Sequence, residues 1–252
     1  MQTLIPQLLI CGMHRSGTSL TGKFFEQLGY DFGSQEKLVK ANSFNQDGYW
    51  ERRDVVELNN KILSVYGSSW DFPIRGNPEI IRTIASKNMY QFADSARKIV
   101  SELQTPFAIK DPRMSLLLPF WKEIIPNAQI IIVVRNPLEV ANSLSQRQKH
   151  SINFGLHLWR SYYQCILSYT DASERFFLFN DRLLNAEEKL IEKLSNLLGT
   201  HSSEHIKIAI ANAVNPGLVN HSGLPDPEGV LKSIHQKVLV SLWKQMRHEA
   251  DS

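Results

Sequence analysis

One short stretch constrains the fold more than any other: four apolar residues that lead into a loop bounded by two glycines. Residues 8–11 read Leu-Leu-Ile-Cys, and Gly12 and Gly17 then enclose four residues. Such an apolar run is typical of a strand buried on both faces of a parallel sheet. Apolar residues then recur at helical spacing: Leu20, Phe24, Phe25 and Leu28. The stretch therefore predicts a buried strand, a tight loop and a helix, which is the first unit of an α/β fold.

The rest of the chain alternates the same two kinds of element. Apolar runs predict strands at residues 107–109, 129–134 and 176–179. Apolar periodicity predicts helices at 116–125, 137–149, around 158–167, 190–198 and 230–246. This alternation is typical of a three-layer, P-loop-like α/β fold with a central, mostly parallel sheet and helices on both faces. Two long irregular segments, 30–77 and 212–227, are expected to serve function, because compact domains rarely carry idle loops of that length.

Composition limits the class of protein. The 252 residues carry 28 Lys+Arg and 25 Asp+Glu, a net charge of +3 that is too small to indicate nucleic acid or a membrane surface. We expect one domain over residues 1–252. No signal peptide is apparent, and the apolar runs are far shorter than the roughly 20 residues of a membrane span, so a soluble cytoplasmic protein is expected. Two cysteines, Cys11 and Cys165, exclude a disulfide framework and a cysteine-based zinc site, and they fit a reducing compartment.

The glycine-bounded loop has the spacing of a Walker A motif, but Thr18 stands where that motif has its lysine. Glycines let the backbone turn and present N–H groups, and the start of a helix adds partial positive charge. The loop therefore predicts an anion site whose first cation is Arg15, with the hydroxyls of Thr18 and Ser19 following. The alternative is a strand–helix turn that merely contains glycine.

A second cation follows the strand at 129–134. In ATP-hydrolysing P-loop proteins such a strand commonly ends in an Asp that helps to hold Mg²⁺. Here Arg135 follows it, Pro137 opens a helix, and Ser143 lies eight residues beyond the arginine. Ligands of open α/β sheets bind outside the carboxyl ends of the strands, so this pair could hold a second anionic group. The alternative is a surface arginine and an unrelated helical serine.

In these two motifs the sequence resembles the sulfotransferases that use 3′-phosphoadenosine 5′-phosphosulfate (PAPS), and its order and spacing are closest to the bacterial single-domain branch. The resemblance implies that Arg15-Ser16-Gly17-Thr18-Ser19 binds the 5′-phosphosulfate and that Arg135 and Ser143 bind the 3′-phosphate. The resemblance extends to two further features of the sequence, Lys110-Asp111-Pro112-Arg113 and the helix that contains Trp159. The sequence departs from the family at Asn180-Asp181, where Tyr-Glu is usual. His14 is expected to pack or to contact the cofactor.

The resemblance implies transfer of a sulfuryl group to a hydroxyl or amine of a carbohydrate or small molecule, without a metal. We expect Arg15 and Lys110 to act as the cations. The loop before residue 52 holds a Gly, two aromatics and an acid, which suggests an acceptor wall, and Glu51 is the candidate general base with Asp47 behind it. The alternative for Glu51 is a carboxylate that stabilises the start of a helix over 52–65. The remaining histidines have no metal-like spacing.

Two other functions stay open from the sequence. A P-loop kinase of nucleosides or small molecules is disfavoured by Thr18 and by the missing strand-terminal Asp. A non-catalytic module could hold a nucleotide or a sulfated glycan through Arg15 and Arg135. The presence of Lys110 and Glu51, a candidate cation and a candidate base, argues against a non-catalytic module.

Overall fold

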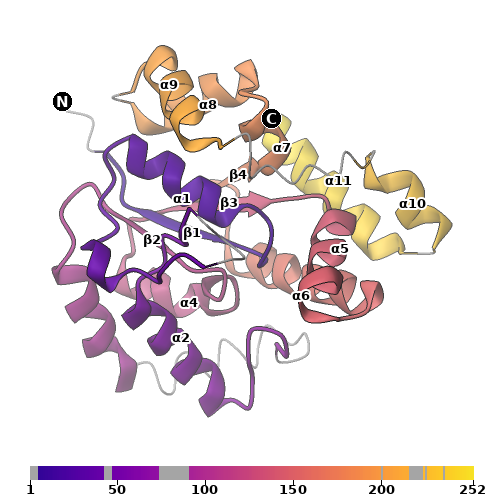
Figure 1. The fold of residues 1–252 in the computed structure, drawn as a ribbon, viewed down its shortest axis with the longest axis horizontal. Helices are drawn as coiled ribbons and strands as arrows, with labels where there is room; N and C mark the ends of the chain where they lie inside the picture. Colours follow the sequence, from indigo (N-terminus) through magenta and orange to yellow (C-terminus); the bar gives the residue numbers. More distant parts are fainter. Residues whose placement is uncertain are drawn as a thin grey trace.

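The fold is built on a parallel sheet (Figure 1). The structure is a computed structural model, which describes residues 5–42, 47–73, 91–199, 201–215, 224, 226–234 and 236–252. The strands are β1 (Leu8–Gly12), β2 (Ala108–Lys110), β3 (Gln129–Val134) and β4 (Arg175–Phe179), in the spatial order β2-β1-β3-β4. Every pairing between them is parallel. The predicted parallel α/β sheet is confirmed.

Both faces of the sheet are buried, which explains why its strands are apolar throughout. Side chains alternate between faces along a strand. Leu9 and Cys11 accordingly belong to one hydrophobic cluster, and Leu8 and Ile10 to another on the opposite face.

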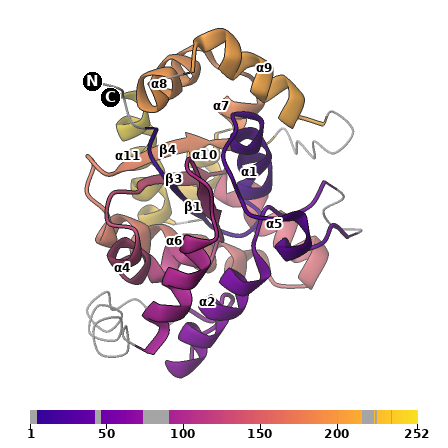
Figure 2. The same ribbon diagram turned by 90° about the vertical axis from the view of Figure 1, so that its left-hand side faces the viewer.

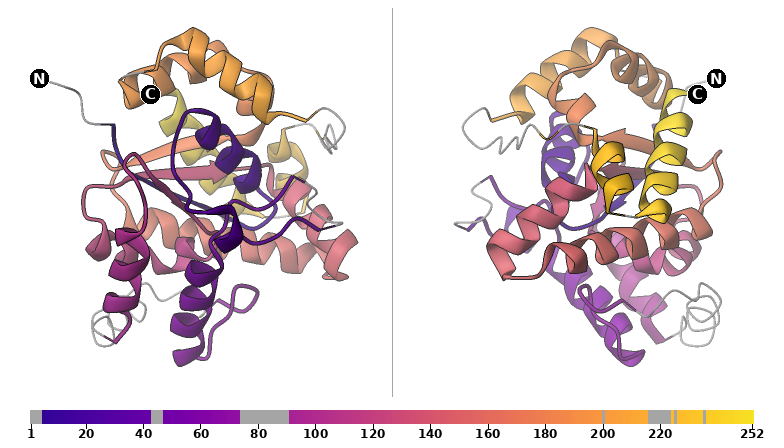
Figure 3. Two further views of the ribbon diagram at one scale, coloured as in Figure 1. Left: turned by 60° about the vertical axis from the view of Figure 1, so that its left-hand side comes forward. Right: turned by 90° about the vertical axis from the view of Figure 1, so that its right-hand side faces the viewer.

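Helices cover each face as a separate layer (Figures 2 and 3). One layer consists of α1 (Thr18–Gln27), α7 (Asn180–Leu184), α8 (Glu188–Leu198) and α9 (Ser203–Ala213). The other consists of α2 (Arg53–Val65), a helix at residues 91–101, α4 (Met114–Ile124), α5 (Pro137–Gln148), α6 (Ile152–Tyr169), α10 (Pro227–Ser233) and α11 (Lys237–Asp251). A short 3-10 turn, η1 (Gln35–Lys37), lies in the segment between α1 and α2.

The predicted last helix, over residues 230–246, is wrong. The structure has two helices there: α10 ends at Ser233 and α11 begins at Lys237. The N–H of Gln236 donates to the carbonyl of Leu231, which turns the chain between them. Apolar residues continue at helical spacing across this break, so periodicity could not reveal it.

The parallel arrangement brings three loops to one edge of the sheet. The carboxyl ends of β1, β2 and β3 lie side by side, because β1 pairs with both of its neighbours in parallel. Gly12, Lys110 and Arg135 stand at or directly after these three ends. Within the described residues, no helix is long and apolar enough to cross a membrane.

Candidate active site

The loop between β1 and α1, residues 12–17 and here called the glycine loop, turns through left-handed backbone conformations. Arg15 has φ 71° and Gly17 has φ 95°. Gly17 is the N-cap residue of α1 and has no side chain that could cap it, so the first-turn N–H groups of α1 receive no side-chain cap there. A helix start of this kind, preceded by a curled backbone, suits an anion.

Buried hydroxyl groups hold the glycine loop in place. The N–H of Gly12 donates to Ser115 Oγ at 2.9 Å, and Ser115 Oγ donates to the Gly12 carbonyl at 3.1 Å. The hydroxyls of Ser16 and Tyr163 lie 3.2 Å apart, and Tyr163 donates to the carbonyl of Val133 at 2.7 Å. Ser16, predicted to bind cofactor, thus directs its side chain into the core. Whether its backbone serves a ligand stays a prediction.

Three arginines gather beside the glycine loop, and we call them the arginine cluster: Arg15, Arg135 and Arg147. Arg15 Nε donates to Ser143 Oγ at 3.1 Å, and Arg135 Nη1 lies 3.4 Å from the carbonyl of Arg15. The first motif and the second, more than a hundred residues apart in sequence, are therefore in contact. Burial, Arg147 and Arg135 lower the pKa of Arg15 to about 10. Glu139, at 2.6 Å from Arg135 Nε, balances part of the charge.

Arg147 was missed by the sequence analysis, although a signal was present. Glu139, Ser143 and Arg147 follow one another at intervals of four residues in α5. Residues at this spacing lie on one face of a helix. Once Ser143 is assigned to the site, Arg147 one turn later is the natural next candidate.

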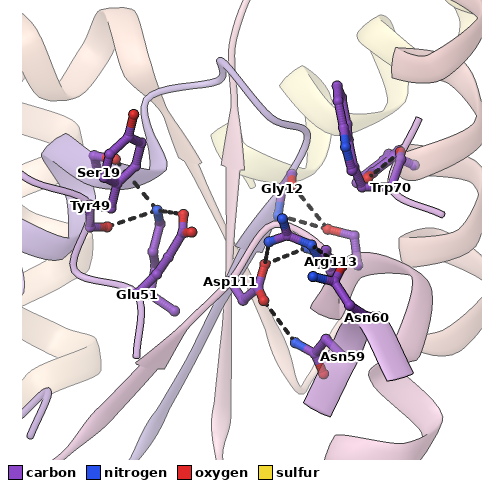
Figure 4. Close-up of polar contacts among 12 residues, drawn as sticks. Gly12, Ser19, Tyr49, Glu51, Asn59, Asn60, Trp70, Asp111 and Arg113 are labelled. Atoms are coloured by element: carbon purple, nitrogen blue, oxygen red, sulfur yellow. Dashed lines mark hydrogen bonds and ion pairs between the residues drawn. The ribbon is translucent and has the colours of Figure 1, made fainter. Parts of the chain in front are cut away.

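Lys110 and Glu51 form a buried ion pair beside the first turn of α1 (Figure 4). Lys110 Nζ lies 2.5 Å from Glu51 Oε1, 2.9 Å from the carbonyl of Tyr49 and 3.4 Å from Ser19 Oγ. The two side chains are 1% and 11% exposed. Burial raises the pKa of the Glu51 carboxyl, while Lys110 opposes that shift. A carboxylate with a raised pKa in a buried site suits a general base. Glu51 precedes Arg52, the N-cap residue of α2, and its side chain pairs with Lys110.

Asp47, the second candidate base, lies elsewhere. Its carboxylate pairs with Lys23 at 3.2 Å, and both side chains are partly exposed. The described contacts of Asp47 thus connect it to α1 and not to the Lys110–Glu51 pair.

A chain of buried polar groups fixes the segment that follows Lys110 (Figure 4). Asp111 is fully buried, accepts from Asn59 Nδ2 at 2.9 Å and pairs with Arg113 at 2.9 Å. Asn59 Oδ1 in turn accepts from Trp121 Nε1 at 2.9 Å. Arg113 Nε donates to Asn60 Oδ1 at 2.9 Å. This network was not predicted, because its partners are remote in sequence and unremarkable one by one.

The ring of His14 lies against two aromatic side chains. Its ring centroid lies 4.7 Å from that of Trp70 and 6.1 Å from that of Tyr162. Nε2 is buried and has no hydrogen-bond partner among the described residues. Burial, followed by the charges of Arg113, Lys110 and Arg15, holds the pKa of His14 well below its usual value. The imidazole is therefore neutral, and it packs against aromatic rings.

Asn180, the departure noted in the sequence, lies against the glycine loop. A Cβ added to Gly17 would stand 2.0 Å from Asn180 Oδ1. Asn180 is buried, while the neighbouring Asp181 pairs with Arg247 at 2.7 Å. Position 17 is thus restricted by this contact as well as by its left-handed backbone. No group of three or more potential metal ligands occurs among the residues that the structure describes.

Residues 6–201 match the model of the Sulfotransferase family. No curated protein sequence matches the chain. Among solved structures, the sulfotransferase domain of the Synechococcus PCC 7002 olefin synthase has a TM-score of 0.49 and 16% identity, over 88% of this chain and 86% of that one.

Two further solved structures are of the same kind. A sulfotransferase domain from the curacin biosynthetic pathway has a TM-score of 0.48 and 13% identity, over 87% of each chain. Sulfotransferase STF9 from Mycobacterium avium has a TM-score of 0.47 and 11% identity, over 83% of this chain and 68% of that one. Because the family model spans most of the sequence, including the glycine loop, Glu51, Lys110 and the arginine cluster, the chain belongs to the sulfotransferase family.

Proposed function

We propose that this protein transfers the sulfuryl group of PAPS to a hydroxyl or amine of a carbohydrate or other small molecule. The observation that carries the proposal is the arginine cluster beside the glycine loop. Burial, followed by the charges of Arg147 and Arg135, lowers the pKa of Arg15, and the contribution of the two arginines reflects repulsion among the three like charges. A multiply charged anion would relieve that repulsion, and guanidinium groups bind phosphate oxygens through paired hydrogen bonds.

PAPS carries two anionic groups, and this supports the proposal because the two motifs predicted to bind anions lie next to each other. The N–H groups of the glycine loop and the start of α1, with Arg15, Thr18 and Ser19, would hold the 5′-phosphosulfate. Arg135, Ser143 and Arg147 would hold the 3′-phosphate, and the hydrogen bond from Arg15 to Ser143 joins this part of the site to the first. In this arrangement guanidinium groups supply the positive charge that Mg²⁺ supplies in ATP-dependent enzymes.

The reaction then needs a base on the acceptor side, and we assign this role to Glu51. The acceptor oxygen forms a bond to sulfur while the bond between sulfur and the 5′-phosphate oxygen breaks. The acceptor's proton goes to Glu51, and adenosine 3′,5′-bisphosphate leaves. Arg15 and Lys110 would stabilise the charge that develops on the sulfuryl and phosphate oxygens.

Thermal melting tests the choice of donor. Adenosine 3′,5′-bisphosphate should raise the melting temperature in the presence of a chelator, and more than ATP with Mg²⁺ does. At a hundredfold excess over Kd the free energy of unfolding should rise by about 2.7 kcal/mol. A larger shift with ATP and Mg²⁺, or loss of the bisphosphate shift on chelation, would point to a kinase instead.

We further propose that residues 1–252 act as one domain in a reducing, cytoplasmic compartment. The helices beyond the matched region support the first part, because α9 packs on α1 and α11 packs on β4. Cys11 and Cys165, both buried and unpaired, support the second.

A further inference from the structure

Lys110, at the end of β2, contacts two other segments of the site. Its ammonium group contacts Glu51 and the carbonyl of Tyr49, which belong to the segment before α2, and the hydroxyl of Ser19 in the first turn of α1 (Figure 4). Ser19 belongs to the predicted anion site, and Glu51 is the candidate base. One cation therefore lies between the group that would meet the donor and the group that would meet the acceptor.

The three contacts are unequal in length. The bond to Glu51 is the shortest at 2.5 Å, and the one to Ser19 is the longest at 3.4 Å. A donor phosphate at the start of α1 would add negative charge on the side of the long contact. Because the side chain of Lys110 is 1% exposed, water screens this attraction weakly. The ammonium should then move away from Glu51 towards the donor.

We infer that Lys110 couples donor binding to the proton affinity of Glu51: before the donor binds it holds the carboxylate in an ion pair, and donor binding draws it away. This inference rests on the proposed function and adds an order of events to it. Burial raises the pKa of Glu51, but the ion pair with Lys110 opposes that shift, so the paired carboxylate is a weaker base than it would be without Lys110. Glu51 therefore becomes a stronger base once the donor is in place.

The other charges around Glu51 determine the direction of the change. Burial and the fully buried Asp111 favour the protonated carboxyl, whereas Lys110 and Arg113 favour the carboxylate. Arg113 is held by Asp111 and Asn60 and has no contact with the glycine loop among its described hydrogen bonds. Losing Lys110 alone therefore raises the affinity of Glu51 for a proton. The complex should take up a fraction of a proton, so that part of the Glu51 population stays ionised and can act as the base.

Calorimetry can measure this uptake without knowledge of the acceptor. Adenosine 3′,5′-bisphosphate is titrated into the protein between pH 6 and 7.5 in two buffers of different ionisation enthalpy, which gives the protons exchanged on binding. The wild type should take up more protons than Glu51→Gln, and Lys110→Met should lose the extra uptake too. Asp47→Asn is the matched control, since its ion pair with Lys23 is partly exposed, and it should behave like the wild type.

The outcomes separate the two proposals. Equal proton exchange in the wild type and in Glu51→Gln, with the bisphosphate bound by both, overturns the coupling and leaves the donor assignment intact. Failure of the wild type to bind the bisphosphate overturns the proposed function itself. If Glu51→Gln does not fold, Lys110→Met supplies the same comparison.

Discussion

At the scale of single residues, the cations of the site differ in what balances their charge. Lys110 lies against Glu51 and Arg113 against Asp111, both within 3 Å. Arg15 instead donates to the neutral hydroxyl of Ser143. An anion that reaches the glycine loop should therefore gain most from Arg15, whose described side-chain bond goes to a neutral group, whereas Glu139 already balances part of the charge of Arg135.

Arg135→Ala should discriminate between ligands with and without a 3′-phosphate. A hydrogen bond between charged partners contributes about 1.5–3 kcal/mol, so affinity for adenosine 3′,5′-bisphosphate should fall roughly tenfold to a hundredfold. Affinity for adenosine 5′-phosphosulfate should change little. Arg97→Ala removes an exposed arginine paired with Asp94 and serves as the control. Equal weakening of both ligands would show that Arg135 supports the fold and does not recognise the phosphate.

Glu51→Gln should separate catalysis from donor binding. Glutamine keeps the volume and most of the hydrogen bonds but not the basicity, so turnover should fall by about 10²–10⁴. The acceptor for this assay is chosen from a panel of sugars and phenols, and the rate is measured in single turnover. Bisphosphate affinity should change far less than the rate.

The control for this prediction is Asp47→Asn, whose turnover should stay within a few-fold of the wild type. Turnover near normal in Glu51→Gln would remove Glu51 as the base. A loss in Asp47→Asn would favour Asp47 in that role, in spite of its pairing with Lys23.

At the scale of the elements, the junction of β1 and α1 depends on a glycine that meets another side chain. Gly17 and Gly29 both have left-handed backbone, with φ 95° and 85°. A Cβ at Gly29 would meet nothing within 4 Å, whereas one at Gly17 would meet Asn180 Oδ1. A side chain would therefore strain the backbone at both positions, but only at Gly17 would it also collide with another residue.

Gly17→Ala and Gly29→Ala should therefore diverge in ligand binding. Left-handed backbone costs an ordinary residue about 1–2 kcal/mol, so both variants should lose stability in urea unfolding. Only Gly17→Ala should also weaken the bisphosphate, because the displaced Asn180 or the shifted glycine loop disturbs the anion site. Unchanged bisphosphate affinity in Gly17→Ala would show that position 17 does not shape that site.

Elements that depend on a local sequence pattern could be predicted. Features that depend on contacts between residues remote in sequence could not. The strand predicted at residues 129–134 is β3, residue for residue, because a β-branched run buried on both faces has few alternatives. The break between α10 and α11 depends on how two helices pack, and an apolar period carries no such information. The same limit hid Asn59 and Trp121, whose importance comes only from their bonds to Asp111 and to each other.

At the scale of the whole molecule, folding assembles the site from distant parts of the chain. The sequence indicated Arg15, Lys110 and Arg135 because Lys110 and Arg135 stand at strand ends and Arg15 lies in the loop that follows a strand, and parallel pairing brings those ends together. The direction in which a side chain points could not be predicted. His14 was expected to pack or to contact the cofactor, and in the structure its ring lies against Trp70 and Tyr162. Folding buries the imidazole of His14. The protonation of this side chain therefore links the formation of the site to the stability of the whole protein.

That link predicts how stability depends on pH. An unfolded chain binds a proton at His14 near its ordinary pKa of about 6.5, whereas burial holds the folded pKa well below that value. Below pH 6.5 the unfolded state therefore binds more protons, and the free energy of unfolding falls as pH falls, by up to about 1.4 kcal/mol per pH unit. Urea unfolding between pH 7.5 and 5 measures this slope.

His14→Phe keeps an aromatic ring against Trp70 and cannot take the proton. The slope of its unfolding free energy against pH should therefore be shallower, by an amount close to the binding of one proton. His157→Phe, which replaces an exposed histidine of α6, should keep the wild-type slope. Parallel curves for the wild type and His14→Phe would show that His14 is protonated alike in both states.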